Sequence, residues 1–287
     1  DRATRLERDR RRLVREEGPP VDDDLVSFKL GSGLAGTSLP GVRDHALLIK
    51  PYRRVPEIRR ALAADAHSAP DCVVGGGAAG VEIVCSLAAR SADRPARLVE
   101  AGDEILAEYE PRFRRFAESV LAERGVEVVT GARVAEVESD SLRLEDDRRL
   151  PARSPVWLAG AIAPSLFSES GLATDERGFL SIDDSLRHVA DETIFAVGDC
   201  ATLVPYPDTP KAGVYSVRQG PVLWASLRAA IRGGRPPRYT PQSGFLSLLN
   251  TADGRALLRY KGLVAHHRAA WWLKDLIDRR FMRRYRR

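Results

Sequence analysis

A glycine-rich segment and one acidic residue beyond it are the part of this chain best suited to chemistry. Gly75, Gly77 and Gly80 match the pattern GxGxxG, and Glu100 lies 20 positions beyond Gly80. In this pattern the first glycine permits a tight turn, the second lets the backbone approach a pyrophosphate, and the third lets a helix pack closely on a strand. The pyrophosphate then lies at a helix N-terminus, where unpaired N–H groups favour negative charge. A carboxylate such as Glu100 accepts hydrogen bonds from the adenine ribose and repels a 2′-phosphate, so the pattern favours NADH over NADPH.

The elements that this site needs follow one another in the required order. The sequence of Asp71–Val74 is typical of a short apolar strand. Residues 81–90 are typical of an apolar helix, and residues 96–100 are typical of a second strand. This β–α–β order predicts a dinucleotide site, and the alternative is that the glycines only form a turn in an α/β core. Glu82 stays open between two interpretations, because an acidic residue in the first turn of a helix also simply favours the helix dipole.

The remaining segments predict an α/β chain. Residues 1–30 indicate short strands joined by a turn, and residues 31–51 indicate a loop that connects two units. We expect one helix to begin at Pro56 and another to cover residues 111–124, followed by alternating segments that are typical of an antiparallel meander. Residues 156–160 indicate a buried strand. Strands that alternate with helices predict a mainly parallel sheet with helices on both faces.

Composition narrows the class of protein. Of the 287 residues, 44% are hydrophobic and 30% are charged, which excludes a disordered or fibrous chain and suggests two domains. Cys72, Cys85 and Cys200 are widely spaced and form no CxxC pair, so a disulfide scaffold is excluded and we expect a reducing compartment. The sequence contains no apolar run of about 18 residues, so no membrane-spanning helix is predicted, and no signal peptide is visible. The histidines fall in no metal-ligand spacing: His45, His67, His188, His266 and His267.

Three motifs in a fixed order resemble a known superfamily. GxGxxG with GVE at residues 75–82, VWLAGAIAP at 156–164 and TIFAVGDCA at 193–201 resemble the pyridine nucleotide-disulfide oxidoreductase flavoproteins. The segments KPYRRV, LPGV, KAGVYSVRQGPVL and FLSLLNTADGRALLRYKG further resemble the type II NADH dehydrogenase branch, most of all the FAD-containing dehydrogenases found fused to selenide, water dikinase. The resemblance implies an α/β fold with two dinucleotide-binding domains, a parallel Rossmann-like sheet with an antiparallel meander, and FAD and NADH as cofactors.

The resemblance also implies roles for residues outside the glycine-rich segment. Gly198 and Asp199 would hold the ribitol or pyrophosphate side of FAD. Ala159 and Gly160 would lie where the chain crosses back from the NAD domain to the FAD domain. These four residues complete the predicted cofactor-binding set.

Three candidate catalytic residues follow from the same resemblance. Glu82 would lie near the nicotinamide, and Lys211 and Gln219 would lie near the isoalloxazine. The quinone motif of type II NADH dehydrogenases, AQxAxQQ, is matched at residues 213–219 only by its last glutamine, Gln219. The electron acceptor therefore stays open between a quinone and another compound.

The family begins with its own GxGxxG for FAD, and this chain starts beyond that point, so we expect an FAD domain truncated at its N-terminus. We expect four segments: a first part of the FAD domain at 1–55, the NAD domain at 56–160, a second part of the FAD domain at 161–240, and C-terminal strands with a basic amphipathic helix at 241–287. The implied activity is hydride transfer from NADH to the flavin and on to the acceptor. The alternative is a flavin-deficient NAD(H)-binding or interaction module without turnover.

The C-terminal residues carry the positive charge of the chain. Residues 268–287 hold eight Lys or Arg and two Asp, whereas the formal charge of the whole chain is +5. A helix over residues 269–285 is typical of an amphipathic helix on an anionic membrane surface, and the alternative is a helix docked on the FAD domain. We expect a cytoplasmic protein, peripheral on the inner face of the cytoplasmic membrane if that helix binds lipid, with no nucleic-acid partner and with a homodimer left open. The predicted apolar face comprises Trp272, Leu273, Leu276, Ile277 and Phe281.

Overall fold

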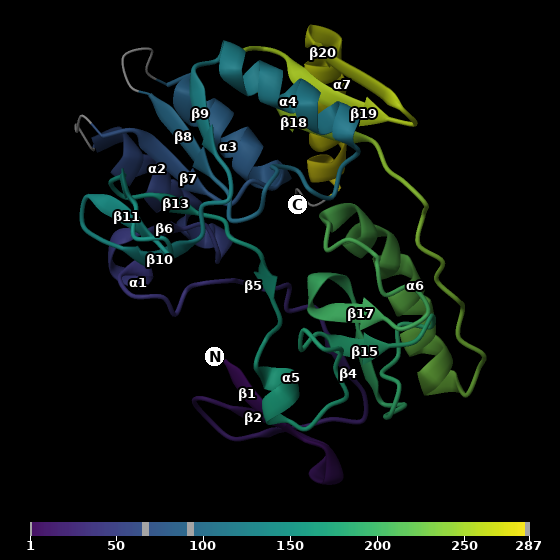
Figure 1. Ribbon diagram of the computed structural model, residues 1–287. Coiled ribbons are helices and arrows are strands. Elements are labelled where there is room, and N and C mark those ends of the chain that lie inside the picture. Colours follow the sequence, from purple (N-terminus) through teal and green to yellow (C-terminus); the bar gives the residue numbers. More distant parts are fainter. Residues whose placement is uncertain (1, 65–68, 91–94, 285–287) are drawn as a thin grey trace. The chain divides into compact units, whose positions relative to one another are not determined.

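The computed structural model describes residues 2–64, 69–90 and 95–284, and the chain divides into two compact units (Figure 1). Unit 1 combines Asp1–Gly33 with Ala161–Ser243, and unit 2 combines Leu34–Gly160 with Gly244–Arg287. His67 and the last three residues of the predicted C-terminal helical region lie outside the described residues.

Unit 2 is built on a five-stranded sheet in which all neighbouring strands are parallel. The strand order is β6-β13-β7-β8-β9, so the first strand of the β–α–β unit lies in the middle of the sheet. This confirms the predicted parallel sheet. Its strands are β6 (Leu47–Leu48), β7 (Asp71–Val74), β8 (Ala96–Val99), β9 (Val126–Val129) and β13 (Val156–Trp157).

The expected connecting loop at residues 31–51 is wrong in part. It contains β5 (Gly33–Leu34), the short helix α1 (Val42–His45) and β6, which pairs with β13 at the edge of the sheet. The glycine and proline content of this segment obscures two short strands, of which β6 extends the five-stranded sheet and β5 pairs with Ala161–Ile162. The next helix, α2 (Val55–Ala64), begins one residue before the predicted Pro56.

The two faces of the sheet are covered by different kinds of structure. Successive strand residues point to opposite faces, so Val73 packs with α3 (Ala78–Ala88) and α4 (Pro111–Glu123), whereas Cys72 and Val74 pack on the other side. That other side is covered by the antiparallel meander of β10 (Val134–Val137), β11 (Ser141–Leu144) and β12 (Arg149–Pro151). The expectation of helices on both faces is therefore only partly correct, because the meander covers most of the second face and the short helix α1 contributes only the buried Val42.

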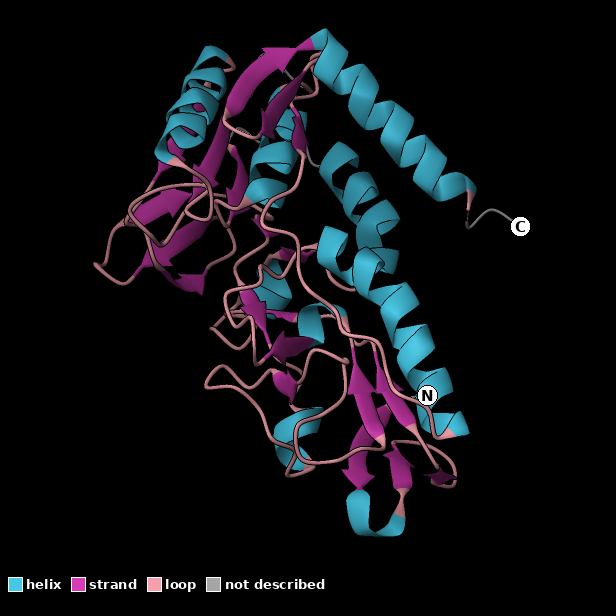
Figure 2. Cartoon of the chain, turned by 90° about the vertical axis from the view of Figure 1, so that its right-hand side faces the viewer, coloured by secondary structure: helices cyan, strands magenta, loops and turns pink. Residues whose placement is uncertain are grey.

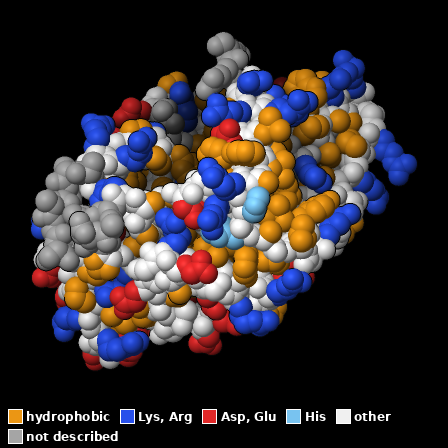
Figure 3. All heavy atoms as spheres, turned by 90° about the horizontal axis from the view of Figure 1, so that it is seen from above, with side chains coloured by type: hydrophobic (Ala, Val, Ile, Leu, Met, Phe, Trp, Pro, Cys, Tyr) orange, Lys and Arg blue, Asp and Glu red, His pale blue; other side chains and the backbone are white. Residues whose placement is uncertain are grey.

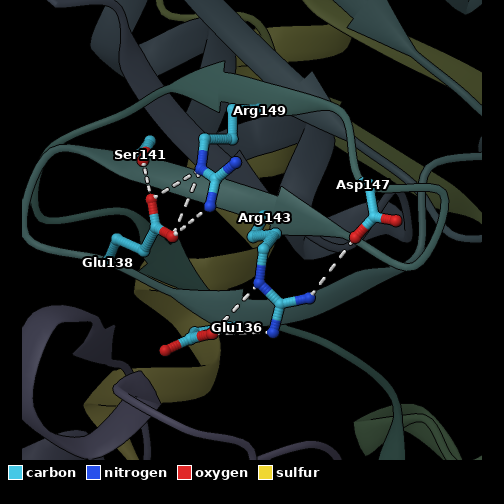
Figure 4. A network of polar contacts seen from close by, with 6 residues as sticks. All are labelled: Glu136, Glu138, Ser141, Arg143, Asp147 and Arg149. Carbon is cyan, nitrogen blue, oxygen red and sulfur yellow. Dashed lines mark hydrogen bonds and ion pairs between the residues drawn. The ribbon is translucent and has the colours of Figure 1, made fainter.

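Ion pairs brace the outer side of the meander (Figure 4). Arg143 donates to Glu136 at 2.7 Å, and Arg149 donates to Glu138 at 3.2 Å. Ser141 donates to the same carboxylate, and the bonds from Ser141 and Arg149 lower the pKa of Glu138. The charged side chains of both ion pairs are partly exposed, so each pair contributes little to the stability of the fold.

The C-terminal segment packs in unit 2. The antiparallel strands β18 (Ser247–Asn250), β19 (Ala256–Tyr260) and β20 (Leu263–His267) lead directly into helix α7 (Arg268–Arg283) (Figure 2). Leu249 and Leu257 join the core that α3 and α4 form on the sheet. Helix α7 packs against β18, β19 and β20 of the same unit.

Unit 1 surrounds a separate core of Phe28, Phe167, Leu180, Ile194 and their neighbours. Two short parallel pairs form its centre, β4 with β16 and β15 with β17, and the predicted N-terminal meander is present as β1-β2-β3. The bounds are β1 (Ala3–Glu7), β2 (Arg12–Arg15), β3 (Val21–Asp22), β4 (Val26–Phe28), β14 (Ala161–Ile162), α5 (Leu166–Glu169), β15 (Leu180–Ile182), β16 (Ile194–Ala196), β17 (Ala201–Leu203) and α6 (Gly213–Arg232).

Candidate dinucleotide and flavin sites

The glycine-rich loop lies where the order of the parallel sheet reverses. Strand β7 is flanked by β8 on one side and β13 on the other, and ligands of doubly wound sheets bind outside the carboxyl ends of strands at such a point. Gly75 follows β7 with a φ of +117°, and its N–H donates to Val99 O at 2.8 Å. A side chain here would strike the carbonyl of Leu158, so glycine is required both by the backbone angle and by the neighbouring strand end.

The other two glycines of the pattern meet different requirements. A Cβ on Gly80 would collide with the carbonyl of Gly75, which is the close approach of helix to strand that the pattern predicts. A Cβ on Gly77 would meet nothing within 4 Å. Gly77 is also the N-cap of α3, and it has no side chain that could accept from the first N–H groups of the helix. Open space beside uncapped N–H groups is what a pyrophosphate needs.

Glu100 is fixed at the end of β8 by two backbone hydrogen bonds. Its Oε2 accepts from the N–H of Gly76 at 2.6 Å, and its Oε1 accepts from the N–H of Gly102 at 2.8 Å. A carboxylate offers about four lone-pair sites, so two remain for the hydroxyls of a ribose. These remaining acceptor sites fit an adenine dinucleotide with a free 2′-hydroxyl.

Glu82 is tied to the C-terminal segment. Its Oε1 accepts from the N–H of Asn250 at 2.8 Å, and Lys274 Nζ on α7 lies 3.5 Å from the same oxygen. The side chains of Glu82 and Lys274 are 29% and 26% exposed. Glu82 therefore forms specific contacts, which a residue that only favours the helix dipole would not require.

Ala159 and Gly160 follow β13, on the other side of the reversal point from the glycine-rich loop. Leu158 N–H donates to Val74 O at 2.8 Å, and Gly160 O accepts from the N–H of Ala35 at 3.0 Å. The expected strand over 156–160 ends earlier, at Trp157, and residues 158–160 form the loop at the strand end. Unit 2 thus brings together the predicted residues of the glycine-rich loop, Glu100 and this crossover.

A pocket in unit 1 gathers the residues predicted to contact the flavin. Gly198, Asp199, Lys211 and Gln219 all line it, together with Tyr215 from α6. Gly198 has a φ of +76°, and its N–H donates to Oε1 of the buried Gln219 at 2.7 Å, which fixes the turn after β16. Among the described residues the carboxylate of Asp199 forms no hydrogen bond, so its oxygens are available to ligand hydroxyls. The residues predicted to contact the flavin therefore line one pocket of unit 1.

Lys211 is held by hydrogen bonds rather than by a salt bridge. Its Nζ donates to the carbonyl of Ala201 and, at 2.9 Å, to the hydroxyl of Thr202. Thr202 in turn donates to Asp175 at 2.7 Å, and Nζ also lies 4.1 Å from the ring centre of Phe179. Burial lowers the pKa of Lys211 to about 8, and the carboxylate of Asp175 opposes this shift. With this pKa the charge of Lys211 changes near physiological pH.

The three cysteines are buried and free. Burial raises the pKa of Cys72 to about 12 and that of Cys85 to about 11, so both remain thiols at neutral pH. Cys200 donates to the carbonyl of Val197 at 3.3 Å, and burial raises its pKa as well. Their environments are those of inert packing cysteines.

The polar partners of these sites were absent from the sequence predictions. Asn250 and Lys274 contact Glu82 from the C-terminal segment, and Thr202 and Asp175 link to Lys211. Asn250 lies in a segment that resembles the family and Lys274 lies on the predicted C-terminal helix, but neither was predicted to contact Glu82. Glu82 and Asn250 are separated by 168 positions, so no local pattern could have joined them.

Residues 4–224 match the family described as pyridine nucleotide-disulphide oxidoreductase. The chain belongs to this family. An NADH dehydrogenase-like protein of Mycobacterium tuberculosis is 29% identical over 213 residues, which cover 69% of this chain and 53% of that protein. A demethylphylloquinone reductase of Synechocystis is 29% identical over 252 residues, which cover 82% of this chain and 60% of that protein.

Solved structures bear out the family fold. The sulfide:quinone oxidoreductase of Aquifex aeolicus has a TM-score of 0.78 at 15% identity, covering 98% of this chain and 73% of that chain. The expected flavoprotein fold with two dinucleotide-binding domains is therefore confirmed. The chain spans little more than half the length of the two curated relatives named above.

Proposed function

We propose that this chain belongs to an NADH dehydrogenase-like flavoprotein, which takes a hydride from NADH onto FAD and passes the electrons to a quinone or another acceptor. One observation carries the proposal: Glu100 is locked onto the N–H groups of Gly76 and Gly102 beside the open N-terminus of α3. That arrangement binds an adenine ribose and a pyrophosphate at one point of a parallel sheet. The relatives named above support a reductase rather than a passive dinucleotide carrier.

In this proposal unit 2 is the NAD unit and unit 1 holds the described part of the FAD unit. NADH supplies the hydride when bound, and FAD accepts it and releases the electrons to the acceptor. The N–H groups that follow Gly77 bind the pyrophosphate, Glu100 binds the ribose, and Glu82 lies toward the nicotinamide. Asp199 accepts hydrogen bonds from the ribitol, and Gln219 keeps the turn at Gly198 in shape. Lys211 contributes a positive charge beside the flavin ring.

A quinone is the acceptor that the relatives favour, since one of them is a demethylphylloquinone reductase. Gln219 stands at the last position of the glutamine-rich quinone motif, but its Oε1 is engaged by Gly198. Gln219 therefore supports the shape of the pocket. A direct hydrogen bond to a quinone would have to be donated by its amide nitrogen, Nε2.

The C-terminal helix supports a peripheral place on an anionic membrane. Trp272 and Leu276 on α7 are 65% and 63% exposed, and Leu273, Ile277 and Met282 are exposed beside them. Figure 3 shows a face of the molecule on which hydrophobic and basic side chains lie intermingled. Within residues 2–64, 69–90 and 95–284, no helix is both long and apolar enough to cross a bilayer. A helix of this composition lies in the interface plane.

Flavin absorbance tests the proposal directly. The purified chain is mixed with FAD, freed of excess flavin, and its visible spectrum is recorded before and after addition of NADH under argon. We expect a retained flavin band that NADH bleaches. A colourless protein that still binds NADH would instead support the alternative, a flavin-deficient NAD(H)-binding module.

A further inference from the structure

The contact between Glu82 and the C-terminal helix joins two segments that the sequence keeps apart. Lys274 Nζ lies 3.5 Å from Glu82 Oε1, and the N–H of Asn250 donates to that same oxygen at 2.8 Å. Lys274 also lies 3.4 Å from Asp278, one turn further along α7. The hydrogen bond from Asn250 holds the carboxylate of Glu82 in place, and the ammonium of Lys274 is the positive charge paired with it.

The position of Glu82 on α3 makes its charge relevant to the dinucleotide. Residues four apart on a helix lie on one face, and side chains tilt toward the helix N-terminus. Glu82 therefore shares a face with Ala78, the first residue of α3, and lies about one turn from the N-terminus of the helix. In the proposed site, the first turn carries the N–H groups that bind the pyrophosphate. An uncompensated carboxylate here opposes the binding of a doubly negative group.

We propose that Lys274 is a positioning residue of the dinucleotide site, which offsets the charge of Glu82 and so permits tight binding of the pyrophosphate. The inference rests on the proposed function, because it requires that the glycine-rich loop bind NADH. It makes α7 a component of the NAD site in addition to any role at a membrane. A ligand that engages the basic side of α7 would then change NADH affinity.

A double-mutant cycle on the full chain tests this inference. The dissociation constant of NADH is measured by fluorescence titration for the unaltered chain, Lys274→Met, Glu82→Gln and the double variant, at low and high ionic strength. We expect Lys274→Met to weaken NADH binding roughly three- to tenfold at low salt and less at 0.5 M salt, since screening weakens charge interactions. In the Glu82→Gln background the same substitution should change the affinity by less than about twofold.

Three controls separate a charge effect from a packing effect. Lys274→Arg keeps the positive charge and should bind NADH as the unaltered chain does. Lys261→Met removes an exposed lysine of the same unit and should leave affinity unchanged. Urea unfolding of each variant shows whether unit 2 remains folded.

The outcomes are distinct. Equal affinities for Lys274→Met and Lys261→Met, or an equal loss with and without Glu82, would overturn the inference while leaving the proposed function intact. A chain that binds no NADH in any form would overturn the proposed function, and the inference with it.

Discussion

Oε2 of Glu100 lies 2.6 Å from the backbone nitrogen of Gly76, so the end of β8 is tied to the loop after β7. The contact leaves no room at Gly76 for a side chain, because a Cβ there would lie 3.0 Å from Oε2 and 2.9 Å from a methyl group of Ile105. The ribose-binding carboxylate and the phosphate-binding loop are therefore one rigid structure, preorganised for a dinucleotide.

Replacing this carboxylate should lower both NADH affinity and the preference for NADH. An amide at position 100 offers one acceptor oxygen, so Glu100→Gln can satisfy only one of the N–H groups of Gly76 and Gly102. We expect NADH to bind about tenfold more weakly, a loss of about 1.4 kcal/mol, and the ratio of NADH to NADPH affinity to fall. Fluorescence titration with both nucleotides checks this. Glu104→Gln, on an exposed surface residue paired with Arg114, is the control and should bind as the unaltered chain does.

Two glycine substitutions should separate folding from binding. Gly80→Ala places a Cβ against the carbonyl of Gly75, so we expect a loss of about 3 kcal/mol in the free energy of unfolding. Gly77→Ala meets open space at a φ of −71°, so its stability should change by less than about 1 kcal/mol while NADH affinity falls. Urea unfolding and NADH titration of both variants check the contrast. Normal NADH affinity in Gly77→Ala would show that the pyrophosphate binds elsewhere.

Gln219 should prove to be a structural support of the flavin pocket. Gln219→Leu leaves the N–H of Gly198 without its acceptor, which costs about 1–3 kcal/mol for a buried donor. Gln219→Glu retains an acceptor at the same position and should keep most of the stability. Unfolding curves compare the two variants, and FAD affinity should follow the same order. Equal stability of both variants would contradict this role.

Lys211 should titrate near neutral pH. Its pKa of about 8 lies below the ordinary 10.5 because burial disfavours the ammonium. Between pH 8 and 10.5 the unfolded chain then holds more protons than the folded chain, so the free energy of unfolding should rise with pH across this window. The chain has only five lysines, so ¹³C-methylated lysines should give few resonances, one with a midpoint near 8 that Lys211→Met removes. A midpoint near 10 for that resonance would contradict the prediction.

The exposed face of α7 should govern binding to anionic vesicles. Trp272→Ser together with Leu276→Ser removes two apolar side chains that are 65% and 63% exposed, so the fold should be unaffected. We expect a smaller fraction of protein to float with phosphatidylglycerol vesicles. Trp224→Ser, at 65% exposure on α6 in the other unit, is the matched control. Equal flotation of all forms would exclude α7 as the lipid-binding surface.

The sequence by itself determined the features that depend on neighbouring residues. The spacing of Gly75, Gly77 and Gly80 predicted a turn, an open approach and a close packing contact, and each requirement is found at its glycine. The β–α–β order predicted the central strands of the parallel sheet, since apolar runs and the turns between them are local signals. Glu100 was predictable because it ends the next strand in the chain.

Only the tertiary structure decided what depends on contacts between distant segments. The sequence did not indicate that residues 134–151 cover one face of the sheet, because short alternating strands carry no signal for the surface they bury. Nor did it indicate that α7 packs in the same unit as α3 and places Lys274 beside Glu82. An amphipathic helix shows that it has an apolar face, but which partner takes that face is settled by the free energy of packing in the folded chain.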